Sequence, residues 1–349
     1  MNDTDQIPER RTPELAPHRA QITAAVAALT PARRRTLLVL ALIVMLGWVG
    51  FGASIDSQAL GGALARLGPR GIAGILCLSL LNYLLRFVRW HWFLGRLGHH
   101  IPRRRHLLIY FAGFSLTMSP GKAGEALRSL YLRPLGVGYG ASLAALFAER
   151  LLDLLAIAVL AAAIVVGHPA YRPLFIGVLA AVLGLAVAVG MPHWNRQLRI
   201  LATQVPRRLR GMAVGLVQAQ LVSRQLLRPN LLVPGVLLGV LAWTAQGYVL
   251  FVVARQFDLN LVPPTAISIY ALAILASVAV FFVPTGMGGT EAAMTALLVA
   301  FGAPLKTALL ATVLCQLSTL WFAVLLGMAA ATVLEWTGSS GGAVEQAPS

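Results

Sequence analysis

A short polar segment interrupts the apolar sequence near residue 120. It reads Ser119-Pro120-Gly121-Lys122-Ala123-Gly124-Glu125-Ala126-Leu127-Arg128. Proline and glycine do not continue a helix cheaply, so an apolar helix should end here and a new one begin near Gly124. The free N–H groups of that new helix, with Lys122 and Arg128, form a predicted anion site. Glu125 either receives a cationic group or a coupling proton, or simply stabilises the helix N-terminus.

A related break, Pro284-Thr285-Gly286-Met287-Gly288-Gly289-Thr290-Glu291-Ala292, lies late in the chain. Gly288, Gly289 and Glu291 are its candidate substrate-binding residues, and Glu291 has the same two interpretations as Glu125. Apolar segments broken by glycine and proline at corresponding places in two halves of a chain are typical of transporter binding sites. The alternative is that each break is a tight turn between ordinary helices, or a point of close helix packing.

Polar side chains also lie inside an apolar stretch at residues 71–94. Asn82, Arg86 and Arg89 follow one another at i, i+4 and i+7, so they share one helical face. Arg89 lies near the end of the stretch, where it either faces the interior or extends to the headgroups. Arg86 lies a turn deeper, and we expect it to face a polar interior or a lipid phosphate.

A third group, Glu149, Arg150 and Asp153, lies inside the apolar stretch 141–166. The two acids share one helical face, and Arg150 is about 100° around the helix from Glu149. Charges inside an apolar span are costly, so we expect all three in the interior of the helix bundle. They form either an ion-pair network with Arg86 or Arg128, or the wall of a substrate cavity between two hairpins.

Composition indicates what must position these groups. Of 349 residues, 58% are hydrophobic and 11% are charged, against about 25% charged in ordinary soluble domains. Several apolar runs reach the roughly 20 residues that a bilayer-crossing helix needs. We therefore expect an all-α polytopic membrane protein with about six to eight transmembrane helices.

The net charge of +16 comes from 28 basic and 12 acidic residues. In a soluble protein this balance would suggest a nucleic-acid partner. Here the arginines fall mostly in short loops between apolar runs, which favours positive-inside topology and attraction to anionic lipids. We expect no nucleic-acid partner. Arg33-Arg34-Arg35 precedes the first span, 36–55, and predicts a cytoplasmic N-terminus.

The chain is predicted to consist of two tails and one membrane domain. Its parts are a disordered cytoplasmic tail at 1–32, a membrane domain at 33–335 and a short tail at 336–349. Within the membrane domain we expect hairpins at about 107–133 and 265–301 and a basic cytoplasmic connection at 192–230. The connection carries an interfacial helix around Arg207 to Leu227, or is a plain basic loop. With six full spans, the two hairpins enter from opposite faces, as in an inverted repeat.

Histidines at 91, 99, 100 and 106 gather near one predicted membrane interface, beside tryptophan and arginine, and are interpreted as interfacial residues. The sequence offers no nucleotide-binding loop and no convincing set of metal ligands. Cys77 and Cys315 lie inside apolar runs, which favours simple packing. We therefore expect no cofactor, no metal and no catalytic residue.

These features, in this order, resemble the membrane region of the lysylphosphatidylglycerol synthases, a family also called flippase-like proteins. The matching pieces are Asn82 with Arg89-Trp90, Pro120-Gly121-x-x-Gly124-Glu125-x-x-Arg128, Glu149-Arg150-x-x-Asp153 and Pro284-x-Gly286-x-Gly288-Gly289-x-Glu291. They cover about residues 36 to 335. Their order and spacing together are more specific than any single piece.

The resemblance implies a membrane region that translocates or handles lipids. Some members of that family carry a soluble aminoacyl-transfer domain after it. We expect a stand-alone member without that domain, which does not synthesise lysylphosphatidylglycerol. It would lie in a bacterial inner membrane and move a phospholipid, aminoacyl-lipid, glycolipid or hopanoid-type lipid between leaflets. Its expected partners are membrane lipids with anionic headgroups and enzymes of lipid or envelope biosynthesis. The alternatives are a membrane-embedded lipid-modifying transferase and a non-catalytic scaffold of a biosynthetic complex.

Overall fold

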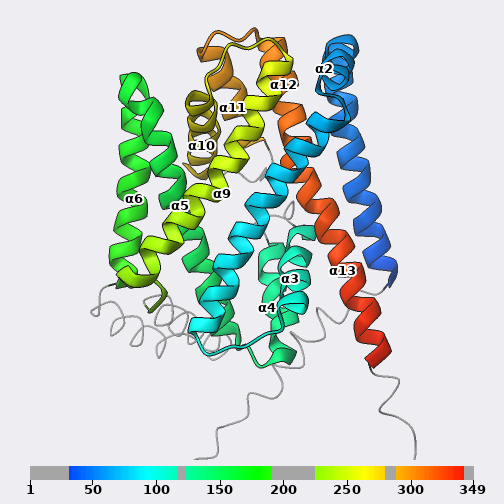
Figure 1. The fold of residues 1–349 in the computed structure, drawn as a ribbon, viewed down its shortest axis with the longest axis vertical. Coiled ribbons are helices and arrows are strands. Elements are labelled where there is room, and N and C mark those ends of the chain that lie inside the picture. The colour runs from blue at the N-terminus through cyan, green and yellow to red at the C-terminus, as the bar shows by residue number, and fades with distance from the viewer. Residues whose placement is uncertain (1–30, 117–122, 191–224, 280–287, 342–349) are drawn as a thin grey trace, which may run out of the picture. The chain divides into compact units, whose positions relative to one another are not determined.

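The computed structural model describes residues 31–116, 123–190, 225–279 and 288–341 (Figure 1). The chain divides into two compact units, Met1–Leu42 and Ile43–Ser349. The first contributes the start of helix α2, and the second contains the features analysed below. Within the described ranges the regular elements are helices. Nearly all of the predicted tail at 1–32, most of the basic connection at 192–230 with its interfacial helix, and the central residues of both predicted breaks lie outside these ranges.

Helix α2 (Pro31–Arg96) contains two sharp breaks in its backbone. Asp56 has φ −164° and ψ 98°, and Gly68 has φ 58°, a left-handed value that glycine adopts without strain. The Asp56 carboxylate accepts the Ala59 N–H at 2.8 Å and so begins the next helical piece. The breaks lie where the sequence predicts the loop between the spans 36–55 and 71–94.

The sequence predicts further spans at about 141–166, 173–191, 231–254 and 307–334. Helices α5 (Tyr139–Gly167), α6 (Arg172–Gly190) and α9 (Pro229–Gln256) match the first three. The fourth is covered by α12 (Leu305–Gln316) and α13 (Phe322–Gly341) together. Three stretches of the described chain are long and apolar enough to cross a bilayer, namely Met45–Arg96, Pro229–Gln256 and Leu305–Leu334. The chain is thus an all-α, multi-pass membrane protein, as its composition predicts.

The first predicted hairpin consists of two short helices, α3 (Arg103–Ala112) and α4 (Ala123–Leu132), which pack against each other. A single 3-10 turn, Gly113–Leu116, extends α3. The sequence predicts that this hairpin begins at about residue 107, with Arg103 to His106 in a loop before it, whereas α3 already begins at Arg103. Pro102, at ψ 128°, is not helical and marks the position directly before the helix.

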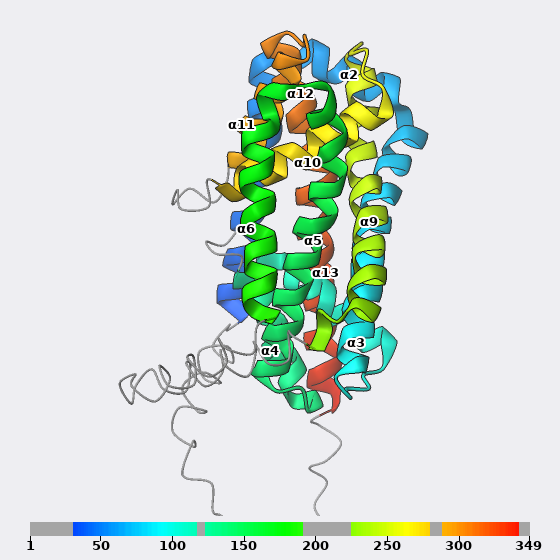
Figure 2. The same cartoon turned by 90° about the vertical axis from the view of Figure 1, so that its left-hand side faces the viewer.

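The second hairpin pairs α10 (Pro263–Ala279) with α11 (Gly289–Ala300). Gly288 has φ 107° immediately before α11, a conformation that side chains rarely adopt. Figures 1 and 2 place α3 and α4 near one end of the second unit and α10 and α11 near the other. This is the arrangement expected of hairpins that enter from opposite faces.

The last predicted span is interrupted by a π-helical segment, Leu317–Trp321, which joins α12 to α13. A π segment accommodates an extra residue in a helix and frees carbonyl groups from their usual partners. Two donors on α2 reach these carbonyls: the Ser79 hydroxyl bonds Ser318 O at 2.8 Å, and the Tyr83 hydroxyl bonds Thr319 O. The sequence did not predict this segment.

The end of the last span is also placed differently from the prediction. Helix α13 continues to Gly341, whereas the predicted tail begins at residue 336. The segment 336–341 contains no proline, and its glycines weaken a helix without blocking it.

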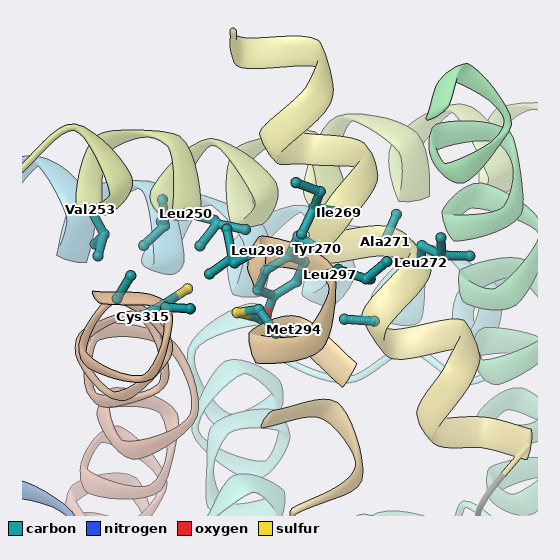
Figure 3. Close-up of a cluster of buried hydrophobic side chains, with 14 of the residues drawn as sticks. Leu250, Val253, Ile269, Tyr270, Ala271, Leu272, Met294, Leu297, Leu298 and Cys315 are labelled. Atoms are coloured by element: carbon teal, nitrogen blue, oxygen red, sulfur yellow. The ribbon is translucent and has the colours of Figure 1, made fainter. Parts of the chain in front are cut away.

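Two hydrophobic cores hold the helices together. The first lies among α5, α9, α10, α11 and α12, where Tyr270, Met294 and Cys315 meet (Figure 3). The second joins the C-terminal arm of α2 to α3, α5 and α13. The buried position of Cys315 agrees with its predicted packing role, whereas Cys77 is exposed.

Helix α13 crosses the first hairpin at Gly327 with almost no clearance. A Cβ atom there would lie 2.7 Å from Phe111 O and would also overlap the backbone N of Ser115. Because both neighbours are backbone atoms, they do not yield as a flexible side chain would. Gly74 on α2 is a helical glycine with open space around it.

We expect Gly327→Ala to lower the free energy of unfolding by about 1–3 kcal/mol, because overpacking forces the backbone to shift. The matched variant Gly74→Ala should be neutral or slightly stabilising, since alanine is the better helix former. Chemical denaturation in detergent micelles measures both. Equal stability changes in the two variants would show that α13 does not dock on the hairpin at this point.

Candidate functional site

Helix α5 carries two acidic side chains into the interior. Glu149 is 0% exposed and Asp153 is 3% exposed. Because they are four residues apart on one helix, their carboxylates point to the same side. Two buried carboxylates need positive partners or hydrogen-bond donors to remain ionised in such surroundings.

Arginines from α2 and α4 supply these partners. Arg86 Nη2 lies 3.3 Å from Glu149 Oε1 and 3.3 Å from Asp153 Oδ2, so it bridges the two acids. Arg89 pairs with Asp153 and donates to Gly235 O at 3.2 Å. Arg128 Nη1 lies 3.1 Å from Glu149 Oε2. The pairs that Arg86 and Arg89 form with the two acids join residues more than 60 positions apart in the chain, and Arg128 is 21 positions from Glu149.

Arg150 completes the group from the side of α5. Its guanidinium lies 3.6 Å from Glu149 Oε1 and 3.7 Å from Asp153 Oδ2. Its side chain is 29% exposed, whereas those of Arg89 and Arg128 are fully covered. We call Arg86, Arg89, Arg128, Arg150, Glu149 and Asp153 the arginine cluster.

Glycines make room for these large side chains. A Cβ at Gly239 on α9 would lie 2.9 Å from Arg89 Nη1, and one at Gly113 would lie 2.6 Å from Arg128 Nε. Gly235 is equally close to Leu152 on α5, with 2.8 Å to its Cδ1 atom. The helices can thus approach one another with two arginines between them.

Aromatic rings surround the guanidinium of Arg128. Its Cζ atom lies 3.9 Å from the centroid of Tyr110, 5.3 Å from that of Trp90 and 5.4 Å from that of Phe114. Ring faces attract a cation and partly replace lost hydration. The Tyr110 hydroxyl also donates to Glu149 Oε1 at 2.8 Å. Tyr110 therefore contacts both members of the Arg128–Glu149 pair.

Arg128 is fully covered, and its hydrogen bonding is incomplete within the described part of the chain. The Nε and Nη2 groups of Arg128 make no hydrogen bond to any residue within the described ranges. Buried donors without acceptors are costly, which makes this a favourable place for an anion.

The structure thus gathers Arg86, Arg128, Glu149, Arg150 and Asp153, as the ion-pair interpretation predicts. Arg89, for which the sequence left two positions open, belongs with them and does not extend to the headgroups. The reason is that Asp153 and Gly235 O offer it buried partners.

Other predicted residues lie apart from the arginine cluster or outside the description. Asn82 is buried, but its amide donates to Ala242 O at 2.8 Å. Lys122 lies outside the described residues. Gly124 and Glu125 belong to α4, and the Glu125 side chain is not described.

Glu291, the acidic residue of the second break, has a structural role. The Gly288 N–H donates to Glu291 Oε2 at 3.0 Å, so Glu291 stabilises the start of α11. Gly289 follows in the first turn, where an added Cβ would lie 3.5 Å from Ser277 of α10. These contacts match the helix-terminus interpretation of Glu291.

Aromatic members of the site were missed from the sequence, including Tyr110 and Phe114, and Trp90 entered only through the family resemblance. They are aromatic residues near arginines, which a single sequence does not separate from ordinary core residues. His106, interpreted from the sequence as interfacial, is 0% exposed and lies inside the protein. Its Nε2 accepts the Trp90 indole N–H at 2.9 Å, and its Nδ1 lies 2.7 Å from Nδ1 of His91. Within the described residues, no three His, Cys, Asp or Glu side chains are placed to hold a metal ion.

We expect Glu149→Gln to destabilise the protein by about 3–5 kcal/mol, because it leaves buried arginines without their carboxylate. The same acid-to-amide change at Asp258, whose side chain is 81% exposed and pairs with Arg66 at 2.8 Å, should cost less than about 1 kcal/mol. Denaturation in detergent micelles compares them. If Glu149→Gln is as mild as Asp258→Asn, the arginine cluster does not depend on Glu149.

Comparison with known proteins adds the family. No curated protein matches the chain. The family model described as the lysylphosphatidylglycerol synthase TM region matches residues 24–327. That range includes both hairpins and every residue of the arginine cluster. The chain therefore belongs to the lysylphosphatidylglycerol synthase TM region family.

Proposed function

We propose that this protein moves a lipid with an anionic, phosphate-bearing headgroup between the leaflets of a bacterial inner membrane, and that the arginine cluster binds the headgroup. Membership of a lipid-handling membrane family supports the general class. The observation that carries the specific proposal is that two nitrogen groups of the fully covered Arg128 guanidinium have no acceptor among the described residues. A purely structural ion pair needs no such unused donors.

The chemistry of the arginines favours phosphate as the ligand. A guanidinium is a planar fork of donors that matches phosphate oxygens, and it remains charged at any physiological pH. Arg128 has two nitrogen groups without acceptors among the described residues. A phosphate beside Arg128 would accept hydrogen bonds from these donors.

The exposed part of the arginine cluster suggests how a headgroup enters. Arg150 is the most exposed of the four arginines, and Arg128 is fully covered. A headgroup that meets Arg150 first would then pass to Arg86 and Arg128. Lys122, just before α4 in the sequence, would add a further positive charge to this path. The lipid tails would remain in the bilayer, since apolar side chains such as Val88 and Leu143 are exposed nearby on α2 and α5.

The proposed orientation in the membrane rests on the basic segments. Arg33-Arg34-Arg35, Arg103-Arg104-Arg105 and the arginines of 192–230 would face the cytoplasm. The N-terminus would then be cytoplasmic and the first hairpin would be entered from that side. Enzymes of lipid or envelope biosynthesis would be its natural partners.

Leaflet exchange in proteoliposomes tests the proposal. Arg128→Gln should slow exchange of a fluorescent anionic phospholipid about tenfold or more, the effect of losing one charge-assisted hydrogen bond of about 1.5–3 kcal/mol. Arg66→Gln is the matched control, because Arg66 is an exposed arginine in a surface pair, and it should leave the rate unchanged. Unfolding temperatures in detergent verify that both variants fold.

The same assay separates the other functions. Unchanged exchange in a folded Arg128→Gln variant would remove the arginine cluster from the transport path. A chemically altered lipid would indicate a transferase. If the unmodified protein neither exchanges the lipid nor alters it chemically, the result would indicate a scaffold.

A further inference from the structure

A second group of buried polar side chains lies next to the arginine cluster. It consists of Tyr83 on α2, Gln246 on α9, Tyr270 on α10, Gln316 on α12 and Thr319 in the π segment, and we call it the hydroxyl cluster. These side chains are between 2% and 7% exposed. They bear hydroxyl and amide groups, and they carry no formal charge.

Gln246 lies at the centre of the hydroxyl cluster. Its side chain faces the hydroxyls of both Tyr83 and Tyr270. The Thr319 side chain also faces Tyr270, and its Oγ1 atom lies 3.5 Å from Gln316 Oε1. Five helical elements thus direct hydroxyl or amide groups to one place. Figure 3 shows the Tyr270 ring leaving α10 toward Cys315 and Met294.

Part of the hydrogen-bonding capacity of this region is unused. Gln246 is 4% exposed, and its Oε1 atom has no hydrogen-bond donor within the described ranges. The indole N–H of Trp243, one turn before Gln246 on α9, likewise lacks an acceptor there. An unsatisfied buried amide oxygen costs about 1–3 kcal/mol, so such groups persist where a ligand or water completes them.

Trp243 connects the hydroxyl cluster to the arginine cluster. The Arg86 guanidinium carbon lies 5.4 Å from the centroid of the Trp243 ring, and the Trp243 and Tyr270 rings are 6.5 Å apart. On α2, Tyr83 and Arg86 are three residues apart and face the same side. A phosphate at the arginines would therefore place its headgroup substituent beside Gln246 and Tyr270.

We infer that the hydroxyl cluster binds the uncharged polyol part, glycerol or sugar, of the lipid headgroup whose phosphate the arginine cluster binds. The inference rests on the proposed function. Hydroxyl groups both donate and accept hydrogen bonds, so they pair with tyrosine, glutamine and threonine side chains whether these act as donors or as acceptors. A headgroup ammonium would instead meet the positive charge of the nearby Arg86.

A pair of lipids with equal charge tests this inference in proteoliposomes. Phosphatidylglycerol carries two headgroup hydroxyls, and phosphatidylpropanol has the same phosphate and carbon chain without them. Sites built for a hydroxyl discriminate strongly against analogues that lack it. The unmodified protein should exchange fluorescent phosphatidylglycerol at least about tenfold faster than fluorescent phosphatidylpropanol.

Two variants assign the preference to the hydroxyl cluster. Gln246→Leu and Tyr270→Phe should slow phosphatidylglycerol exchange about tenfold and leave phosphatidylpropanol exchange unchanged, which also shows that they fold. Tyr248→Phe removes the same hydroxyl from an exposed tyrosine on α9 and should retain the full preference.

Two results would overturn the inference while leaving the proposed function standing. One is equal exchange of the two lipids by the unmodified protein, as expected if water alone fills the cluster. The other is slowing of both lipids by the same factor in Gln246→Leu and Tyr270→Phe. Failure of the unmodified protein to exchange either lipid would overturn the proposed function, and this inference with it.

Discussion

The burial of Glu149 is the constraint on which the arrangement of helices around the site depends. A fully covered carboxylate loses its hydration and persists when several donors replace it. Here those donors come from three different elements: Arg86 from α2, Tyr110 from α3 and Arg128 from α4. The Glu149 side chain of α5 thereby fixes both helices of the first hairpin and the C-terminal arm of α2. The short hairpin helices, which are too short to span a bilayer, gain their position from this contact.

The arginine cluster differs from an ordinary structural ion pair because Arg128 keeps buried donors for which no described residue supplies an acceptor. The fold surrounds its buried arginines with neutral groups: aromatic rings around Arg128, and the carbonyls of Gly235 and Glu149 beside Arg89. Such partners weaken the cost of a buried cation without cancelling its field. A ligand anion therefore still gains from entering. A fully paired cluster would hold the helices equally well and would attract nothing.

Much of the fold was predictable from the sequence because hydrophobic runs and helix breakers are local signals. The all-helical class, the division of α2 near Asp56 and the two short hairpins follow from run lengths, Gly and Pro. The grouping of Glu149 with Asp153 follows from helical periodicity. What could not be predicted depends on distant contacts, such as the aromatic enclosure of Arg128 and the burial of His106 against Trp90. The position of Arg89 is an intermediate case, since its choice between interior and headgroups depended on whether an acceptor on α9 was near.

The π segment at Leu317–Trp321 has a consequence for the rotation of the last helix. An inserted residue turns everything after it by about 100° relative to a continuous α-helix. Gly327 follows this segment by six positions and lies on the face of α13 that contacts the backbone of Phe111 and Ser115. Loss of one residue between 317 and 321 would rotate that small face away and bring a side chain into its place. The number of residues between the π segment and Gly327 therefore matters as much as their identity.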